Sequence, residues 1–252
     1  MLPNKKIIAF DLDGTLAPSK SPITESMVEL VRKLVKQIVV AVTSGGSLAQ
    51  FKTQFLPLFN NNDFVSGNLI LLPTSGTQRY EYDETKQDWQ LTDKEPLAQE
   101  TKEKVKKLFQ EIIDNPIYEI PPNPIGEIIE DRDTQVTFTP NGQQAPIALK
   151  RLFDPDRKKR EKIKDVLVPQ LPEVDLLING NSSIDIVPKG FNKGIGLKKL
   201  LTKLGFAKSD MVYVGDALFL GGNDYSVVEE GIETIAVKGP TETELIIKNW
   251  IS

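Results

Sequence analysis

The chain opens with short apolar runs separated by an amphipathic stretch. Residues 7–10 are all apolar, which is typical of a strand buried on both faces of a parallel sheet. Residues 24–37 instead space their apolar side chains three or four positions apart, which predicts an amphipathic helix with Thr24 as its N-cap. Residues 38–42 predict a second buried strand. A strand, a helix and a strand with short connections form a βαβ unit, so we expect the two strands to be parallel.

The same pattern continues through residues 48–59, which predict another helix, and it returns near the end of the chain. There, Asn192 is the expected N-cap of a helix that Gly205 ends. Residues 211–214 and 235–237 are short apolar runs that predict two more buried strands. These segments together predict an α/β unit built on a parallel sheet.

The middle of the chain has a different character, with strands that we expect to be antiparallel. The predicted elements are a helix over residues 95–114, an irregular proline-rich connection over 116–124, strands over 126–130 and 135–139, a helix that opens at Asp154-Pro155, and a hairpin of 174–178 with 183–187. Such elements form a self-contained α+β unit. We therefore predict a discontinuous α/β core over residues 1–92 and 188–252, with an α+β domain inserted over 93–187.

Acidic side chains follow two of the predicted core strands. Asp11 and Asp13 come directly after the first strand, and Asp216 and Asp224 follow the strand over 211–214. Ligands of open α/β sheets bind outside the carboxyl ends of the strands, so the position of these acids supports a role in binding. Carboxylate oxygens are the ligands that Mg²⁺ prefers, and one carboxylate of a pair can attack phosphorus while the other moves a proton. Taken alone, Asp11 and Asp13 have a plain turn as their alternative, because Asp-Gly is common in loops.

Two further segments carry groups that bind anions. Residues 43–47, Thr-Ser-Gly-Gly-Ser, lie between a predicted strand and a predicted helix, where hydroxyls and free backbone N–H groups form an anion site. A tight turn with a helix cap explains this segment as well. Lys193 begins a predicted helix, where its charge opposes the helix dipole. We interpret Lys193 as the partner of a carboxylate and a phosphate, with a solvated surface lysine as the alternative.

The composition excludes several kinds of catalytic site and partner. The chain has no cysteine and no histidine, which excludes disulfides, thiolate nucleophiles and the usual zinc sites. Acid–base chemistry must then come from carboxylates, lysine, tyrosine or a metal-bound water. A net charge of −4 argues against nucleic acid as the main partner. The sequence shows neither a signal peptide nor an apolar run long enough to span a membrane, so we expect a cytoplasmic protein without membrane association.

In their order along the chain, these motifs resemble the haloacid dehalogenase (HAD) superfamily of phosphotransferases. Asp11-Leu12-Asp13-Gly14-Thr15 is similar to the first motif of that superfamily, and the later motifs match at Ser44, Lys193, Asp216 and Asp224. The resemblance implies the catalytic residues Asp11, Asp13, Ser44 and Lys193, with Asp11 as nucleophile and Asp13 as the acid–base group. It also implies a Mg²⁺ site formed by Asp11, Asp13, Asp216 and Asp224. The implied fold is a Rossmann-like HAD core with an inserted α+β cap of type C2B.

Within this superfamily the chain most resembles the eukaryotic-type phosphomannomutase family, over nearly its whole length. The likeness rests on residues 18–24, Gly45-Gly46-Ser47, Arg132, Thr139-Pro140-Asn141-Gly142 and the loop Gly221-Gly222-Asn223-Asp224. It implies a binding set for a sugar phosphate, formed by Lys20, Gly45, Arg132, Gln143, Lys150, Ser183 and Asp185. Two members depart from the family pattern, because Gln143 and Lys150 stand where the family carries arginines.

The resemblance leaves three functions open. The first is a hexose-phosphate mutase that interconverts mannose 1-phosphate and mannose 6-phosphate, with Mg²⁺ as cofactor and a hexose 1,6-bisphosphate as activator. The second is a sugar-phosphate phosphatase, which the loss of a phosphate-binding arginine at Gln143 favours. The third is a sugar-phosphate-binding protein without catalysis, which the presence of all the core motif residues argues against. The resemblance also implies a homodimer formed through the cap.

Overall fold

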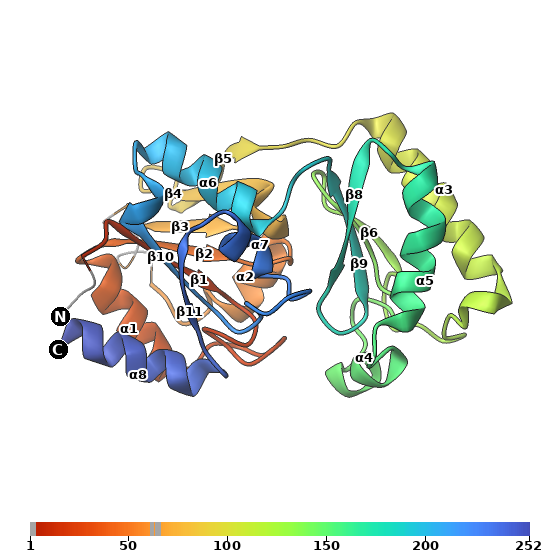
Figure 1. The fold of residues 1–252 in the computed structure, drawn as a ribbon. Helices are drawn as coiled ribbons and strands as arrows, with labels where there is room; N and C mark the ends of the chain where they lie inside the picture. Colours follow the sequence, from red (N-terminus) through yellow and green to blue (C-terminus); the bar gives the residue numbers. More distant parts are fainter. Residues whose placement is uncertain (1–3, 61–62, 64–66) are drawn as a thin grey trace. The chain divides into compact units, whose positions relative to one another are not determined.

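The computed structural model describes residues 4–60, 63 and 67–252. The chain divides into two compact units, Met1–Lys94 with Asn192–Ser252 and Glu95–Phe191, which we call the core unit and the inserted unit. The divisions fall a few residues later than the predicted 92/93 and 187/188. The strand β5 (Asp88–Lys94) runs to the end of the first segment of the core unit, and the turn after β9 (Ser183–Pro188) stays with the inserted unit. Figure 1 shows the elements of both units.

The core unit is built on a mixed sheet. In the described part of the chain its order is β11-β10-β1-β2-β3-β4-β5, with β1 at Ile7–Asp11, β2 at Val39–Thr43, β3 at Leu69–Leu72, β4 at Gln78–Asp83, β10 at Met211–Gly215 and β11 at Glu233–Ala236. The strands from β11 to β3 pair in parallel, which confirms the predicted βαβ arrangement. β4 and β5 add an antiparallel hairpin that the sequence analysis did not predict, because polar side chains dominate both strands.

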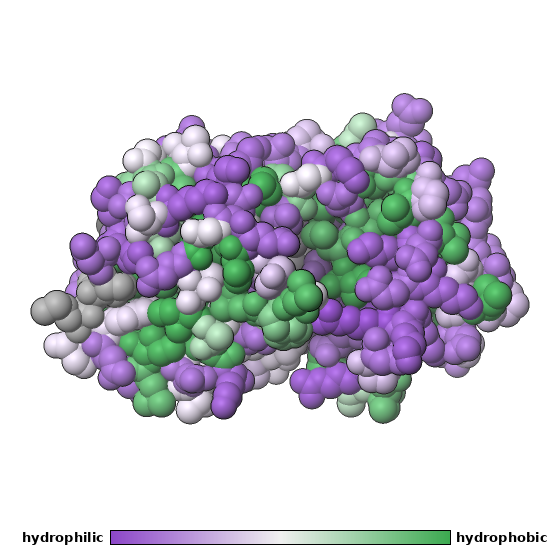
Figure 2. Space-filling view, viewed as in Figure 1, coloured by the Kyte–Doolittle hydropathy of each residue, from purple (hydrophilic) through white to green (hydrophobic). Residues whose placement is uncertain are grey.

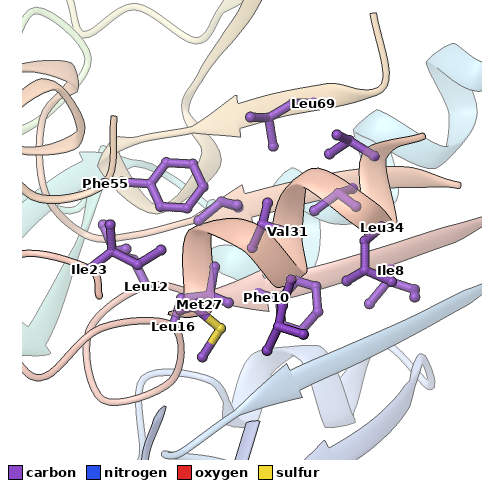
Figure 3. Close-up of a cluster of buried hydrophobic side chains, with 14 of the residues drawn as sticks. Ile8, Phe10, Leu12, Leu16, Ile23, Met27, Val31, Leu34, Phe55 and Leu69 are labelled. Atoms are coloured by element: carbon purple, nitrogen blue, oxygen red, sulfur yellow. The ribbon is translucent and has the colours of Figure 1, made fainter. Parts of the chain in front are cut away.

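Helices cover both faces of this sheet. On one face, α1 (Glu25–Val35), α2 (Leu48–Gln54) and α8 (Pro240–Ile251) pack on alternate residues of β1, including Ile8 and Phe10. Figure 3 shows Phe10, Met27 and Val31 in this cluster. On the other face, α6 (Lys193–Leu204) and α7 (Tyr225–Glu229) pack on the intervening residues of β1. The sheet is therefore buried on both sides, as its continuous apolar strands predict.

Local signals set most helix ends. Thr24 caps α1 by accepting a hydrogen bond from the Met27 backbone N–H at 3.2 Å, and Asn192 caps α6 in the same way through Ile195 at 3.0 Å. Gly205 ends α6 with a φ of +68°, as predicted. The predicted helix over 48–59 is too long, since α2 ends at Gln54. Pro57 explains the early end, because proline disfavours helical geometry in the residue before it and cannot donate to a helix.

The inserted unit is an antiparallel sheet with two of its helices packed on one face. Its order is β6-β7-β9-β8, with β6 at Ile129–Asp131, β7 at Val136–Phe138 and β8 at Val174–Asn179, and its helices are α3 at Gln99–Asp114, α4 at Ile147–Phe153 and α5 at Lys158–Leu167. β8 and β9 form the predicted hairpin. The apolar side chains of α3 and α5 pack on the sheet, where the rings of Phe109 and Phe138 stack with centroids 4.5 Å apart. The opposite face of the sheet carries polar side chains such as Thr137 and Asp185, together with the apolar Leu177 and Val187.

The inserted unit differs from prediction at three places. The strand predicted over 126–130 is β6 at Ile129–Asp131, and the helix predicted from Asp154 begins only at Lys158. Asp154 nevertheless organises this helix start, since its carboxylate accepts the backbone N–H groups of Lys159 and Arg160. The helix α4 was not predicted, because its apolar residues form no buried stripe and Leu152 is 77% exposed.

Polar side chains dominate the visible surface. Figure 2 shows hydrophilic residues over most of the face in view, with apolar residues gathered on the core unit around β11 and on the inserted unit around β8 and β9. Among the residues that the structure describes, no helix has both the length and the apolar character that crossing a bilayer requires.

The sheets and helices of the two units form the predicted fold, a Rossmann-like α/β core and an α+β insertion.

The buried pair Asp154–Arg160 gives a stability prediction. The Arg160 Nε lies 2.8 Å from Asp154 Oδ2 with both side chains almost fully buried, and the same guanidinium donates to the backbone oxygens of Asn179 and Gly180. Asp154→Ala should lower the free energy of unfolding by about 3–5 kcal/mol, because it leaves a buried charge without its partner. Urea unfolding followed by circular dichroism measures this.

The neighbouring pair Asp156–Lys158 supplies a matched control, since it is an exposed ion pair at the same helix start. Asp156→Ala should cost less than about 1 kcal/mol. Equal losses for the two variants would contradict the assignment of Asp154 and Arg160 as a structural pair.

Candidate active site

The predicted core motifs meet at one edge of the sheet. β1 lies between β2 and β10, and all three strands run in the same direction. Asp11 is the last residue of β1, Ser44 follows β2, and Asp216 follows β10. The carboxyl ends of parallel strands meet at the same sheet edge, so motifs that are far apart in the sequence form one site.

A buried lysine connects two of the acids. Lys193 Nζ donates to Asp11 Oδ1 at 2.5 Å and to Asp224 Oδ1 at 2.7 Å. Each of these three residues is at most 3% exposed. The Asn192 cap places Lys193 at the first position of α6, where it opposes the helix dipole. The two carboxylates compensate for this position, and although burial would lower the pKa of Lys193, Asp11 and Asp224 raise it above its usual value.

A tyrosine holds the second of these acids. Tyr213 donates its hydroxyl to Asp224 Oδ1 at 2.7 Å, from the middle of β10. Burial, and then the charge of Asp224, raises the pKa of Tyr213 well above its usual value, so the hydroxyl remains a donor. The sequence analysis did not identify Tyr213, because it lies in an apolar strand and resembles a core residue there. No local pattern indicated its polar contact.

Three acids of the site are placed to hold a cation. One carboxylate oxygen from each of Asp11, Asp216 and Asp224 lies within 4.8 Å of the other two. Burial raises the pKa of Asp11 more than the neighbouring Lys193 ammonium lowers it, and burial and Asp224 raise that of Asp216. Lys193 contacts two of the three carboxylates, those of Asp11 and Asp224. A cluster of carboxylate oxygens of this kind fits Mg²⁺.

Gly14 keeps the loop after β1 close to this group. The glycine has a φ of +85°, and a Cβ added to it would lie 2.4 Å from Asp216 Oδ2. A side chain at this position would therefore displace the carboxylate, in addition to straining the backbone. Gly14 thus allows the loop to approach the Asp216 carboxylate closely.

Asp13, which the family resemblance implied as a fourth Mg²⁺ ligand, lies outside the group of three acids and has its own partners. Its carboxylate accepts the backbone N–H of Lys20 at 2.7 Å and the Lys20 Nζ at 3.3 Å. It also accepts the side-chain amides of Gln50 at 2.9 Å and Gln54 at 3.1 Å. Burial would raise the pKa of Asp13, but the Lys20 charge and the hydrogen bonds from Lys20 and Gln54 lower it below its usual value. The two glutamines were not predicted, although their spacing of four residues puts them on one face of α2.

The loop after β2 is held by a hydrogen bond of its own and by two from the turn after β3. Ser44 Oγ accepts the backbone N–H of Gly46 at 3.0 Å, and Gly45 lies between them. In the turn after β3, the backbone N–H of Thr74 donates to the backbone oxygen of Gly46, and that of Ser75 donates to the backbone oxygen of Ser44, both at 2.8 Å. Thr74 and Ser75 have φ values of +52° and +58°, which are unfavourable for side-chain-bearing residues. Such strain is typical of functional sites, where the surrounding structure maintains it.

The predicted residues of the inserted unit lie on the polar face of its sheet. Asp185 Oδ1 accepts the Thr137 hydroxyl and Oδ2 accepts the Asn179 amide, both at 2.7 Å. Ser183 shares a hydrogen bond of 2.9 Å with the hydroxyl of Thr139. The sequence analysis named Asp185 and Ser183 but not Thr137 or Asn179. The missed residues stand next to the named ones across the antiparallel strands, a relation that only the register reveals.

Arg132, Gln143 and Lys150 also lie together in the inserted unit. The Gln143 amide donates to the hydroxyl of Thr139 at 2.9 Å and accepts from Arg132 at 3.4 Å. Arg132 forms an ion pair with Glu130, and Lys150 Nζ donates to the backbone oxygen of Gln143 at 2.7 Å. Both ends of the Gln143 amide are thus engaged, and the Arg132 charge is balanced by a carboxylate.

Comparison with known proteins relates this chain to phosphotransferases. The phosphomannomutase of Schizosaccharomyces pombe is 28% identical over 232 residues, which cover 88% of this chain and 85% of that protein. The phosphomannomutase of Encephalitozoon cuniculi is 25% identical and covers 95% of this chain and 91% of its own length. These relatives make the chain phosphomannomutase-like in sequence.

Solved structures share the fold. The IMP-nucleotidase of Plasmodium falciparum matches with a TM-score of 0.73 and 16% identity, over 98% of this chain and 70% of that chain. SMU.1108c from Streptococcus mutans UA159 matches with a TM-score of 0.66 and 16% identity, over 98% of this chain and 99% of that chain. The sequence profile of the haloacid dehalogenase-like hydrolases matches residues 8–241. Because this match spans nearly the whole chain, the protein belongs to the haloacid dehalogenase-like hydrolase family.

Proposed function

We propose that this protein is a magnesium-dependent phosphotransferase that interconverts mannose 1-phosphate and mannose 6-phosphate through an aspartyl-phosphate at Asp11. The observation that carries the proposal is the buried contact of Lys193 with Asp11 and Asp224, beside Asp216. The likeness to phosphomannomutases over most of the chain supports the choice of substrate.

The residues of the core unit supply the parts of a two-step transfer. Asp11 attacks phosphorus, the bond from phosphorus to the sugar oxygen breaks, and that oxygen receives the proton that Asp13 took from a hydroxyl in the preceding transfer. In the second step a sugar hydroxyl attacks the phosphorus of the aspartyl-phosphate. Asp13 then takes the proton of the hydroxyl, and the bond to Asp11 breaks. The Lys193 ammonium keeps Asp11 in place and neutralises charge on the transferred group.

Asp11, Asp216 and Asp224 are the residues that would hold Mg²⁺. The ion, when bound, supplies charge neutralisation at the phosphoryl oxygens. Asp13 is left free for proton transfer, because its carboxylate lies with Lys20, Gln50 and Gln54 instead. The backbone N–H groups and the hydroxyl of the loop at Ser44 and Gly45 are suited to the phosphate.

The polar face of the inserted unit is suited to the rest of the substrate. Ser183 and Asp185 can hydrogen-bond to sugar hydroxyls, while Arg132 and Lys150 carry the positive charge that a distal phosphate needs. We assign this face the role of selecting the sugar phosphate.

Hydrolysis of sugar phosphates is the second candidate, and Gln143 favours it. A mutase must hold a second phosphate while the first reacts, which is a task for cationic groups. Gln143 is neutral and already bonded to Thr139 and Arg132, and Glu130 balances the Arg132 charge. With less positive charge available for a distal phosphate, water can replace the sugar hydroxyl as acceptor.

Phosphorus NMR separates these two activities. The protein is incubated with Mg²⁺, mannose 1-phosphate and a catalytic amount of glucose 1,6-bisphosphate. We expect mannose 6-phosphate to accumulate with little inorganic phosphate. Inorganic phosphate as the main product would replace the mutase with the phosphatase, and the absence of both products would overturn the hexose-phosphate assignment.

Asp11→Asn should abolish turnover while the fold stays intact. An amide does not attack phosphorus, and removal of a catalytic nucleophile lowers kcat by several orders of magnitude. Mass spectrometry after incubation with an activated phosphate donor should show a phosphorylated wild-type chain and an unmodified variant. A phosphorylated Asp11→Asn chain would place the nucleophile elsewhere.

Tyr213→Phe should weaken Mg²⁺ binding. The Tyr213 hydroxyl orients Asp224, and loss of such an outer hydrogen bond weakens metal affinity by about 10-fold or more. Calorimetric titration with Mg²⁺ measures the affinity without turnover. Tyr80→Phe is the control, because its hydroxyl contacts Gln78 on β4 rather than an acid of the site, and it should leave the affinity unchanged. Equal Mg²⁺ affinities for wild type and Tyr213→Phe would contradict a role of Tyr213 in metal binding.

A further inference from the structure

Gln50 and Gln54 hold the carboxylate of Asp13 from the first two turns of α2. The Gln50 Nε2 lies 2.9 Å from Asp13 Oδ2, and the Gln54 Nε2 lies 3.1 Å from Asp13 Oδ1. Each carboxylate oxygen thus receives one amide. We propose, on the basis of the function proposed above, that Gln50 and Gln54 are positioning residues for the proton transfers of Asp13.

The two amides fix each other. Gln50 Nε2 also donates to Gln54 Oε1 at 2.7 Å, which leaves the Gln54 Nε2 directed at Asp13. Gln54 is only 4% exposed, so solvent does not compete for its amide. Residues four apart on a helix lie on the same face, and α2 therefore presents both amides to one carboxylate.

Lys20 completes a closed set of hydrogen bonds. Its Nζ donates to Gln50 Oε1 at 2.8 Å and to Asp13 Oδ2 at 3.3 Å, while its backbone N–H donates to Asp13 Oδ1. The oxygen end of the Gln50 amide thus holds the ammonium, and its nitrogen end holds the carboxylate. Rotation of any one of these side chains breaks at least two hydrogen bonds.

Gly46 leaves the space that Gln50 occupies. A Cβ added to Gly46 would lie 1.9 Å from Gln50 Oε1, so only glycine admits the amide at its observed position. The loop that follows β2, whose Ser44 and Gly45 are proposed to bind phosphate, is in this way shaped around the residue that holds Asp13.

Neutral donors suit an acid that must exchange protons. One positive charge, the Lys20 ammonium, already lies 3.3 Å from the Asp13 carboxylate. Amides orient the carboxylate without adding a second positive charge beside it. Asp13 therefore keeps a fixed direction toward the sugar oxygen in both steps, and proton transfer requires such alignment within hydrogen-bond distance.

The test uses p-nitrophenyl phosphate, whose leaving group needs no proton. With this substrate, formation of the aspartyl-phosphate does not depend on Asp13, whereas its hydrolysis needs Asp13 to take a proton from water. The variants are Gln50→Met and Gln54→Met, which keep the side-chain length and remove the amide. Stopped-flow absorbance gives the burst of nitrophenolate and the steady-state rate separately.

We expect both variants to keep the burst rate within about threefold of wild type and to lose about 10- to 100-fold in the steady-state rate, a part of the usual contribution of acid–base catalysis. A purely structural role would lower both rates together, and that result would overturn the proposal. Unchanged steady-state rates would overturn it equally. Gln50 is partly exposed, so Gln50→Met remains a valid test if Gln54→Met lowers stability.

Gln37→Met is the matched control, because its amide donates only to the Lys33 backbone oxygen at the end of α1. It should change neither rate. A wild-type protein that acts on p-nitrophenyl phosphate but on no hexose phosphate would contradict only the substrate of the proposed function. The division between burst and steady state would still report on Gln50 and Gln54.

Discussion

The candidate site depends on one buried ammonium. Lys193 bonds Asp11 at the end of β1 and Asp224 at the start of α7, and it is itself the first residue of α6. Three segments far apart in the sequence therefore meet at a single nitrogen. A buried charge is stable only with well-placed partners, and two carboxylates without the ammonium would repel each other. The lysine thus fixes both the local fold and the charge of the site.

Two acids that stand two residues apart in the first motif have different environments. Burial raises the pKa of Asp11 in spite of the neighbouring Lys193, whereas Lys20 and its hydrogen bonds lower the pKa of Asp13. Pairs of carboxyl groups with opposite shifts are typical of catalytic sites, where each group has a different role. Their surroundings differ accordingly, since Asp11 contacts Lys193 and Asp13 is held by Lys20, Gln50 and Gln54.

In the inserted unit, burial of one face of the sheet decides where the polar side chains lie. The sheet of this unit buries its apolar face against α3 and α5, so the polar side chains must occupy the other face. Asp185 accepts a hydroxyl and an amide, and Gln143 is bonded to the Thr139 hydroxyl and to Arg132. In the function proposed above, this face would bind sugar hydroxyls, and Arg132 and Lys150 would supply the positive charge for a distal phosphate. The choice between mutase and phosphatase therefore depends on few residues.

The sequence by itself determined the α/β core, the inserted α+β domain, the ends of α1 and α6, and the order of the motifs, because apolar periodicity and capping are local signals. It did not reveal β4 and β5, whose strands are mostly polar, or the early end of α2. Only the tertiary structure placed Gln50 and Gln54 on Asp13 and Tyr213 on Asp224. Hydrogen bonds between distant segments depend on how strands and helices pack, and no local pattern encodes that.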